Sequence, residues 1–378
     1  MVSDKIKVIE VTTSKEMDKF VKFPFSLYKD NPFWTPPLIQ EEIDTLNKDK
    51  NPVFKNALGN YFLAMKRGKI VGRVAVIINW IEVKELKKNK VRFGWFDVVD
   101  DINVTAALMQ KVYSIGKNNG MEFIEGPVGF SNLDKAGMLI KGFEEMNTMI
   151  TWYNYPYYYE HFKKLGFKNL AVWVEYEIKL SSFEKSPEKI KKFSNLMLKR
   201  YHLKVLKFKS KKDILPYVEQ MFRLLEETYG KLQTFVPIQK YQINQYKKKY
   251  FRYIHPDFIK CIVDKDNYLI AFSITMPSFT NALKKANGKT YPFGFFHLLK
   301  ALYFNNRASF YLIGVHPKFQ NKGVTAIIFN EMQKTFNKHG YNIVETNPEL
   351  EENSSIQNLW KNYNHRQHKK RLTVTKRI

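Results

Sequence analysis

The chain of 378 residues contains a single cysteine, Cys261. One thiol can form neither an internal disulfide nor a cysteine-based zinc cluster, so we expect no disulfide framework and no metal. Because Cys261 lies in the apolar run FIKCIVD, we expect it to be a small core residue.

Long apolar runs are also missing. No stretch of 18 or more apolar residues indicates a transmembrane helix, and the first residues, MVSDKIKVIE, lack the apolar stretch of a signal peptide. We therefore expect a cytoplasmic protein. Apolar residues make up 44% of the chain, which supports hydrophobic cores, and the length is sufficient for two domains.

Acidic residues are scarce in the second half. Residues 1–180 hold 26 Lys and Arg against 22 Asp and Glu, whereas residues 181–378 hold 36 against 14, so most of the net charge of +26 lies there. A basic half favours an acidic partner, which could be a nucleotide, a nucleic acid or an anionic membrane. The alternative is that an AT-rich genome uses lysine freely.

The order of expected elements repeats along the chain. Both halves read as strand, helix, hairpin, strand, helix, strand, helix and strand, with hairpins around Arg67-Gly68 and residues 265–267 and a helix over 102–118. This order predicts an α/β (α+β) protein made of tandem units, 1–180 and 181–378. The second unit carries an apolar insertion at about 279–306.

The stretch GVHPKFQNKGVTAIIF, residues 314–329, reads as the end of a strand, a turn and the start of an apolar-faced helix. The first amides of a helix have no internal partner, and the helix dipole places positive charge there. This pattern favours an anion site, and phosphate is the preferred ligand of such sites.

This stretch resembles the pyrophosphate signature of the GNAT superfamily of acyl-CoA-dependent N-acyltransferases. That signature is Gln or Arg, two residues, Gly, one residue, then Gly or Ala; residues 320–323 match it and Thr325 departs from it. The resemblance implies a mixed, mostly antiparallel sheet flanked by helices in each unit, with acetyl-CoA or a longer acyl-CoA as co-substrate.

The resemblance also implies specific roles for residues. The pyrophosphate would bind the backbone of Gln320, Asn321, Lys322, Gly323, Val324 and Thr325. The pantetheine amides would bind the backbone of Ile313 and Val315, and Asn353 would contact the CoA arm. Trp360 stands where the family often has its tyrosine acid, so Tyr363 is the candidate replacement.

The first half resembles the same unit without this chemistry. Its equivalent turn, FDVVDDINV, places Asp97, Asp100 and Asp101 at a helix start, where they cap the helix but repel a pyrophosphate. We therefore expect a degenerate first unit and CoA binding by the second unit alone.

A narrower resemblance extends along most of the chain. The runs PFWTPPLIQEE, FLAMKRGKIVGRVA, GPVGFSNLDKAGMLIKGF and YPFGFFHLLKAL are similar to a long two-unit bacterial GNAT group related to bacterial ceramide synthases. This resemblance implies an N-acyltransferase whose amine acceptor could be a lipid-like long-chain amine. Two alternatives stay open: a tRNA-dependent aminoacyl transferase, whose basic half would bind RNA phosphates, and a non-catalytic CoA-binding protein.

Acyl transfer to an amine needs a proton acceptor, and Glu345 at the end of the strand YNIVET is our candidate base. A surface carboxylate at a strand end is the alternative. Asn132 and Asp134 lie in a Gly-rich loop and are candidates for substrate binding, with turn formation as the competing interpretation.

The insertion contains Phe295, Phe296 and His297, which we also regard as candidates for substrate binding. Its aromatic residues could cover an acyl tunnel or contact an anionic membrane from the cytoplasmic side. The alternative is that the insertion is a core helix joining the two halves.

Overall fold

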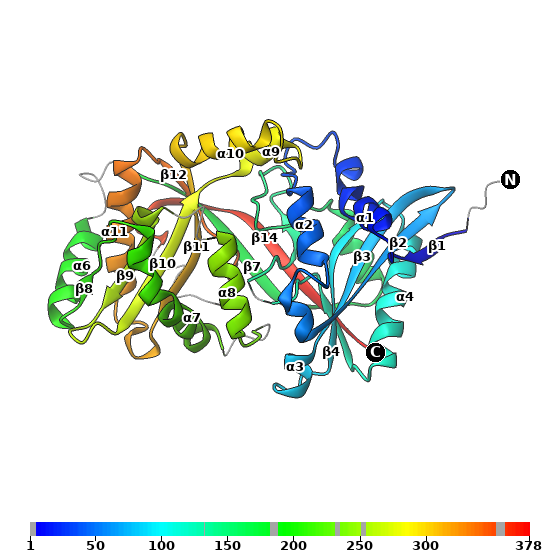
Figure 1. Ribbon diagram of the computed structural model, residues 1–378, viewed down its shortest axis with the longest axis horizontal. Helices are drawn as coiled ribbons and strands as arrows, with labels where there is room; N and C mark the ends of the chain where they lie inside the picture. The colour runs from blue at the N-terminus through cyan, green and yellow to red at the C-terminus, as the bar shows by residue number, and fades with distance from the viewer. Residues whose placement is uncertain (1–4, 132, 182–187, 231–234, 251–254, 353–359) are drawn as a thin grey trace. The chain divides into compact units, whose positions relative to one another are not determined.

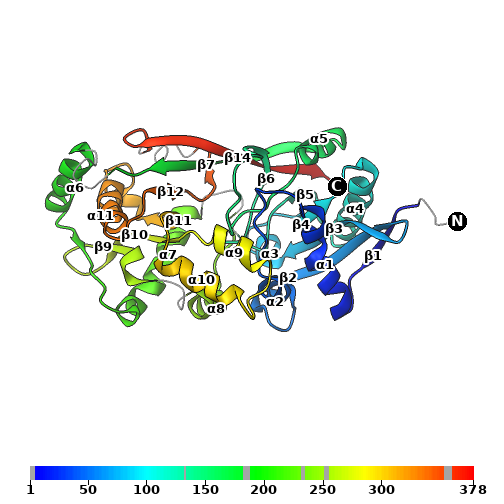
Figure 2. The same ribbon diagram turned by 90° about the horizontal axis from the view of Figure 1, so that it is seen from above.

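We analysed a computed structural model that describes residues 5–131, 133–181, 188–230, 235–250, 255–352 and 360–378 (Figures 1 and 2). The chain divides into two compact units. The first unit comprises Met1–Trp173, Phe279–Leu298 and Lys369–Ile378, and the second comprises Val174–Ser278 and Leu299–His368.

The first unit contains most of the N-terminal elements. They are β1 (Lys7–Glu10), α1 (Ser14–Leu27), α2 (Ile39–Leu46), η1 (Pro52–Lys55), β2 (Ala57–Lys66), β3 (Lys69–Asn79), α3 (Trp80–Lys84), β4 (Lys90–Val98), α4 (Ile102–Asn118), β5 (Phe123–Gly126), β6 (Met138–Lys141), α5 (Tyr157–Lys164) and the start of β7 (Lys168–Lys179); α9 (Thr280–Ala286) also belongs to it.

The sheet of the first unit has the strand order β1-β2-β3-β4-β5-β14, where β14 spans Asn364–Arg377, and β6 pairs with β14. All of these pairs are antiparallel except β4 with β5. Both faces of β3 are buried: Val74, Val76 and Ile78 enter one core, and Ala75 and Ile77 enter another. Since neighbouring side chains of a strand point to opposite faces, the sheet is covered on both sides.

Local sequence signals explain where these elements begin and end. Thr13 and Glu16 form a capping box at the start of α1, and Asp101 caps α4. The expected helix over 102–118 is confirmed as α4. The hairpin at Arg67-Gly68 is also confirmed, with φ values of 50° and 75° at these two positions.

The second unit contains the end of β7 and most of the C-terminal elements. They are α6 (Glu188–Arg200), β8 (Lys204–Val205), η3 (Lys211–Ile214), α7 (Leu215–Tyr229), α8 (Lys240–Tyr250), η4 (Pro256–Phe258), β9 (Ile259–Val263), β10 (Leu269–Pro277), the end of α10 (Gly294–Tyr303), β11 (Arg307–Val315), η5 (Pro317–Phe319), α11 (Thr325–Lys338), β12 (Ile343–Glu345), β13 (Glu349–Leu350) and the start of β14.

The sheet of the second unit repeats that of the first. Its order is β8-β9-β10-β11-β12-β7, and its pairs are antiparallel except β11 with β12. Helix α11 packs against β9, β10 and α6, and α7 packs against β10 and β11. Cys261 is fully buried in β9, as expected, and burial raises the pKa of its thiol. The repeat confirms tandem units with mostly antiparallel sheets.

The units differ from a simple division of the sequence at residue 180. The end of β14 belongs to the first unit because residues 374–377 pair with β5. The start of the insertion also belongs to the first unit, where the amide of Ile39 donates to the carbonyl of Gly288. The apolar insertion is therefore not wholly part of the CoA-binding unit that we expected to contain it.

Candidate active site

Residues 320–323 form a mostly exposed turn before α11, and this turn is here called the cradle. Asn321 and Gly323 have φ values of 58° and 78°, in the left-handed region that favours glycine. A Cβ atom at position 323 would also lie 2.0 Å from a ring carbon of Phe193 in α6. Glycine is therefore required at 323 both by the backbone conformation and by this contact.

Helix α11 begins without a side-chain cap. Its N-cap residue, Val324, forms no capping hydrogen bond, and no acidic residue lies in the first turn. In the first unit the corresponding helix α4 begins at Asp101, whose carboxylate accepts a hydrogen bond from the amide of Asn103 at 3.0 Å. Only the second of these two helix starts therefore has the electrostatics of an anion site.

The side chains around this turn have internal contacts. Gln320 Nε2 donates to the carbonyl of Val315 at 3.0 Å, which ties the turn to the end of β11. The Lys322 ammonium lies 5.8 Å from the ring of Phe319 and 6.0 Å from that of Tyr201. The Gln320 side chain thus shapes the turn, while the exposed Lys322 keeps a cation beside it.

The backbone carbonyls expected to bind pantetheine accept hydrogen bonds from α7. Tyr229 Oη donates to Ile313 O at 2.6 Å, and Thr228 Oγ1 donates to Val315 O at 3.2 Å. Thr325 is the first residue of α11 and is half-buried. Asn353 lies outside the described residues, and so does Asn132.

The strands β11 and β12 pair for three residues only. The parallel ladder ends with Ser309 opposite Glu345. Tyr311 then bulges out of the β10–β11 ladder, and its carbonyl accepts a hydrogen bond of 2.6 Å from Asn347 Nδ2. Glu345 therefore occupies the last paired position of β12, followed directly by a turn that contacts the bulge.

Glu345 is buried in a cluster of charged side chains rather than exposed at a strand end. Single donor atoms of Glu177, Glu345 and His368 all lie within 4.8 Å of one another, and all three residues are buried. Arg307 lies 2.6 Å from Glu177 and 3.7 Å from Glu345, and Arg366 Nε donates to Glu177 at 3.0 Å. The exposed-carboxylate alternative for Glu345 is wrong.

Glu177 is paired with two arginine side chains in this cluster. Arg307 binds one carboxylate oxygen of Glu177 and Arg366 binds the other. Burial favours the neutral acid, but these hydrogen bonds and charges outweigh it, so the pKa of Glu177 is lowered. The two carboxylates and the histidine are a donor set that suits a divalent cation. Because both Glu177 oxygens bind guanidinium groups, we interpret the cluster as an ion-pair network.

Trp360 is a core residue. It is 2% exposed, and its ring centroid lies 4.8 Å from Phe329 and 6.0 Å from Phe310. Its indole Nε1 lies 3.3 Å from Glu349 Oε2 and donates a hydrogen bond to it. Burial raises the pKa of Glu349 to about 8, against weaker opposing hydrogen bonds from Trp360 and Thr346. Glu349 is thus a carboxyl group whose pKa lies near neutral pH.

Tyr363, the candidate acid, is half-buried against the same core. Its amide donates to the carbonyl of Trp360 at 2.9 Å, and burial raises the pKa of its hydroxyl. A raised pKa keeps the hydroxyl protonated but makes its proton harder to donate.

The Gly-rich loop supports the turn-forming interpretation of Asp134. Its carboxylate accepts hydrogen bonds from the amide of Ser131 at 2.8 Å and from its hydroxyl at 3.1 Å. Asp134 belongs to the first unit, whereas the cradle and the charged cluster belong to the second. The acidic turn of that unit is likewise occupied, since Asp97 binds Arg73 at 2.7 Å and Asp101 binds Lys66 at 2.8 Å.

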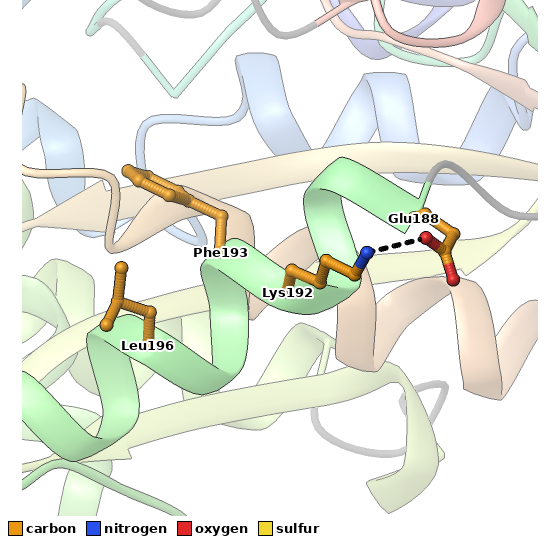
Figure 3. Close-up of a pocket in the computed structure, with 4 residues that line it drawn as sticks. All are labelled: Glu188, Lys192, Phe193 and Leu196. Carbon is orange, nitrogen blue, oxygen red and sulfur yellow. Dashed lines mark ion pairs between the residues drawn. The ribbon is translucent and has the colours of Figure 1, made fainter.

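Helix α6 carries a surface hollow next to the cradle. Its lining residues are Glu188, Lys192, Phe193 and Leu196. Glu188 and Lys192 form an ion pair of 2.9 Å, which Figure 3 marks with a dashed line. Since the Phe193 ring also contacts Gly323, this apolar hollow adjoins the turn that precedes α11.

The strand order, the short parallel pair β11–β12 and the turn before α11 are those of the tandem GNAT fold. A solved tandem GNAT protein from the clavulanic acid biosynthesis pathway is similar to it with a TM-score of 0.56, 8% identity and coverage of 99% of this chain and 98% of that one. No protein-family model matches the sequence.

Two curated proteins are similar to this chain over nearly its whole length. Protein YghO of Escherichia coli (strain K12) is 26% identical over 370 residues, which cover 95% of this chain and 92% of YghO. The bacterial ceramide synthase of Caulobacter vibrioides (strain NA1000 / CB15N) is 23% identical over 368 residues, which cover 94% of each chain.

Sequence reasoning missed Glu177, His368, Arg307, Arg366 and Glu349. A signal existed for one of them, because the apolar strand AVWVEYEIKL carries Glu175 and Glu177 two residues apart, so both point to the same face. Both are buried. Acidic residues inside an apolar strand indicate buried charge that requires a partner.

Proposed function

We propose that this protein is an N-acyltransferase that moves an acyl group from acyl-CoA to an amine, with CoA bound by the second unit. The observation that carries the proposal is the uncapped start of α11 behind residues 320–323, with Lys322 exposed beside it. In this arrangement the pyrophosphate accepts hydrogen bonds from backbone amides of the turn and of Thr325, because the next two amides, those of Ala326 and Ile327, already donate to the carbonyls of Gly323 and Val324.

The reaction joins the amine nitrogen to the thioester carbonyl carbon and breaks the carbon–sulfur bond. The amine loses a proton to a base, and the CoA thiolate gains one. We assign the base to Glu345, which lies at the end of the β11–β12 ladder and 3.7 Å from Arg307. Tyr363 is our candidate for the acid. Holding the two substrates together supplies a large part of the acceleration.

The binding half of this proposal is tested by calorimetry with CoA. Lys322→Glu reverses the charge at the cradle and is expected to weaken CoA binding at least tenfold. Lys265→Glu, at another exposed lysine in the β9–β10 turn, is the matched control, and Asp101→Asn tests the first unit. Equal CoA affinity in the wild type and the Lys322 variant would contradict the site.

The chemical half is tested by turnover of the full chain with acyl-CoA and an amine. Glu345→Gln preserves the shape of the side chain, and we expect turnover to fall roughly a hundredfold while CoA affinity stays within twofold of the wild type. Unchanged turnover would leave Glu345 with a structural role in the charged cluster.

A finer form of the proposal concerns the acceptor. The Caulobacter relative is named a bacterial ceramide synthase, and its similarity over 94% of this chain favours a long-chain, lipid-like amine as the acceptor here. A medium- or long-chain acyl-CoA is then expected to bind more tightly than acetyl-CoA. Assays that pair acetyl-CoA or palmitoyl-CoA with a short or a long primary amine test this. Equal rates for all four pairs would remove the lipid assignment.

A further inference from the structure

Residues 291–304, here called the aromatic segment, expose an unusual amount of apolar surface. Tyr291, Phe293, Phe296, Tyr303 and Phe304 are each at least 60% exposed, and Phe295 and Leu299 are each 39% exposed. Only five other large apolar side chains are exposed in all the remaining described residues. Monomeric proteins rarely leave such clusters uncovered, so the segment marks an interaction surface.

The orientation of α10 produces this surface. Phe295, Leu299 and Tyr303 are spaced four residues apart, so they form one stripe along the helix. On its other side the helix buries small residues, Gly294 and Ala301. An ordinary surface helix buries its large apolar side chains. This exposure contradicts the alternative that the aromatic side chains of the segment are core residues.

The charge around the segment identifies the partner. Residues 267–330 contain no aspartate or glutamate but seven lysines and arginines. Three of these lysines flank or lie within the segment and are exposed: Lys285, Lys289 and Lys300. Arg307, by contrast, binds Glu177. An apolar surface on a stretch of chain whose charged residues are all cations is complementary to a bilayer with anionic headgroups.

The geometry excludes a spanning role for the described helices, since none of them is long and apolar enough to cross a membrane. An amphipathic helix of ten residues with exposed aromatic side chains can instead lie in the headgroup region, with its apolar face inserted. We propose that the aromatic segment and its lysines dock this protein on an anionic lipid membrane. This inference does not depend on the proposed acyl transfer.

Vesicle sedimentation with the full chain tests the proposal. The probes are vesicles of phosphatidylcholine alone and vesicles that also contain phosphatidylglycerol. We expect the bound fraction to be at least tenfold higher with the anionic vesicles and to decrease as salt is raised, because added ions screen the lysines.

Two sets of substitutions separate the apolar contribution from the charge. The aromatic variant carries Phe293→Ser, Phe296→Ser and Phe304→Ser, and its control carries Phe123→Ser and Tyr268→Ser, two exposed rings elsewhere. The charge variant carries Lys285→Gln, Lys289→Gln and Lys300→Gln, and its control carries Lys19→Gln, Lys48→Gln and Lys69→Gln, which are also exposed.

We expect the aromatic variant to lose binding to anionic vesicles, the charge variant to lose the preference for phosphatidylglycerol, and both controls to bind like the wild type. Equal binding by the aromatic variant and the wild type overturns the proposal. The competing partner is a second copy of the chain, and sedimentation equilibrium without lipid tests for it. If the wild type is a dimer that the aromatic variant dissociates, and no vesicles are bound, the segment is an interface between two copies of the chain.

Discussion

The raised pKa of Glu349 makes the stability of the protein depend on pH in a defined direction. Its carboxyl pKa rises from the ordinary value of 4.5 to about 8 because burial disfavours the charged form. Between these two values the unfolded chain has released this proton while the folded protein keeps it. Folding then binds a proton, so this contribution to stability is complete below pH 4.5 and is lost as the pH rises towards 8.

The magnitude follows from the width of this window. One pH unit corresponds to about 1.4 kcal/mol for a single proton. The rise from 4.5 to about 8 therefore costs about 5 kcal/mol of unfolding free energy at pH 8.5. Glu349→Gln resembles the protonated acid at every pH. We expect this variant to match the wild type near pH 4.5 and to exceed it by several kcal/mol at pH 8.5.

Urea unfolding followed by circular dichroism at pH 4.5, 6.5 and 8.5 measures this difference. Glu352→Gln replaces an exposed glutamate in the turn that follows Glu349 and serves as the matched control. Its difference from the wild type is expected to be within about 0.5 kcal/mol. If the Glu349 variant differs from the wild type by the same amount at pH 4.5 and 8.5, the carboxyl is not held neutral by burial and the reasoning is refuted.

Three further predictions concern the site. Gly323→Ala is expected to destabilise the protein by about 1 to 3 kcal/mol in urea unfolding, because φ is 78° and Phe193 lies against this position. Adding Phe193→Ala is expected to recover only the part of this loss that is due to the contact. An unchanged unfolding midpoint for Gly323→Ala would contradict this account. Arg307→Met removes one partner of the buried Glu177, and we expect the free energy of unfolding to fall by about 3 kcal/mol at pH 7. This loss is expected to become smaller at low pH, where the carboxylates are protonated. A loss that does not depend on pH would indicate that Arg307 contributes through packing. Tyr363→Phe is expected to lower turnover about tenfold without changing CoA affinity if the hydroxyl supplies the proton to the thiolate, and full activity would exclude that role.

Local patterns in the sequence predicted local structure well. The apolar periodicity of residues 102–118 predicted α4 with the observed ends, since Asp101 caps its start. The turn Lys265-Asp266-Asn267 predicted the β9–β10 hairpin, in which Asn267 has a φ of 60°. Gly340, with a φ of 74°, follows the end of α11, where glycine is typical. Each of these features is determined by a few adjacent residues, so a local sequence pattern can predict it.

The charged cluster could not be predicted in the same way. Glu177, Glu345 and His368 come from three strands that lie far apart in the sequence. Their proximity depends on the register of β12 against β7, in which Glu345 stands opposite Glu177. A one-residue shift in register would move such a side chain to the other face of the sheet, so the pairing has to be known before the cluster can be recognised.

The same dependence on pairing explains why the two units do not follow the midpoint of the sequence. In the first unit the strand beside β5 is β14, which comes from the C-terminal end of the chain. In the second unit the strand beside β12 is β7, which begins in the first unit. Each sheet is thus completed by a strand that continues from the other unit. A cut near residue 180 would leave β5 as an edge with unpaired backbone groups, because its partner β14 lies in the other fragment. A repeated order of elements indicates tandem units, but it does not reveal which unit contains each strand. For this chain, residues from both halves of the sequence therefore contribute strands to each unit.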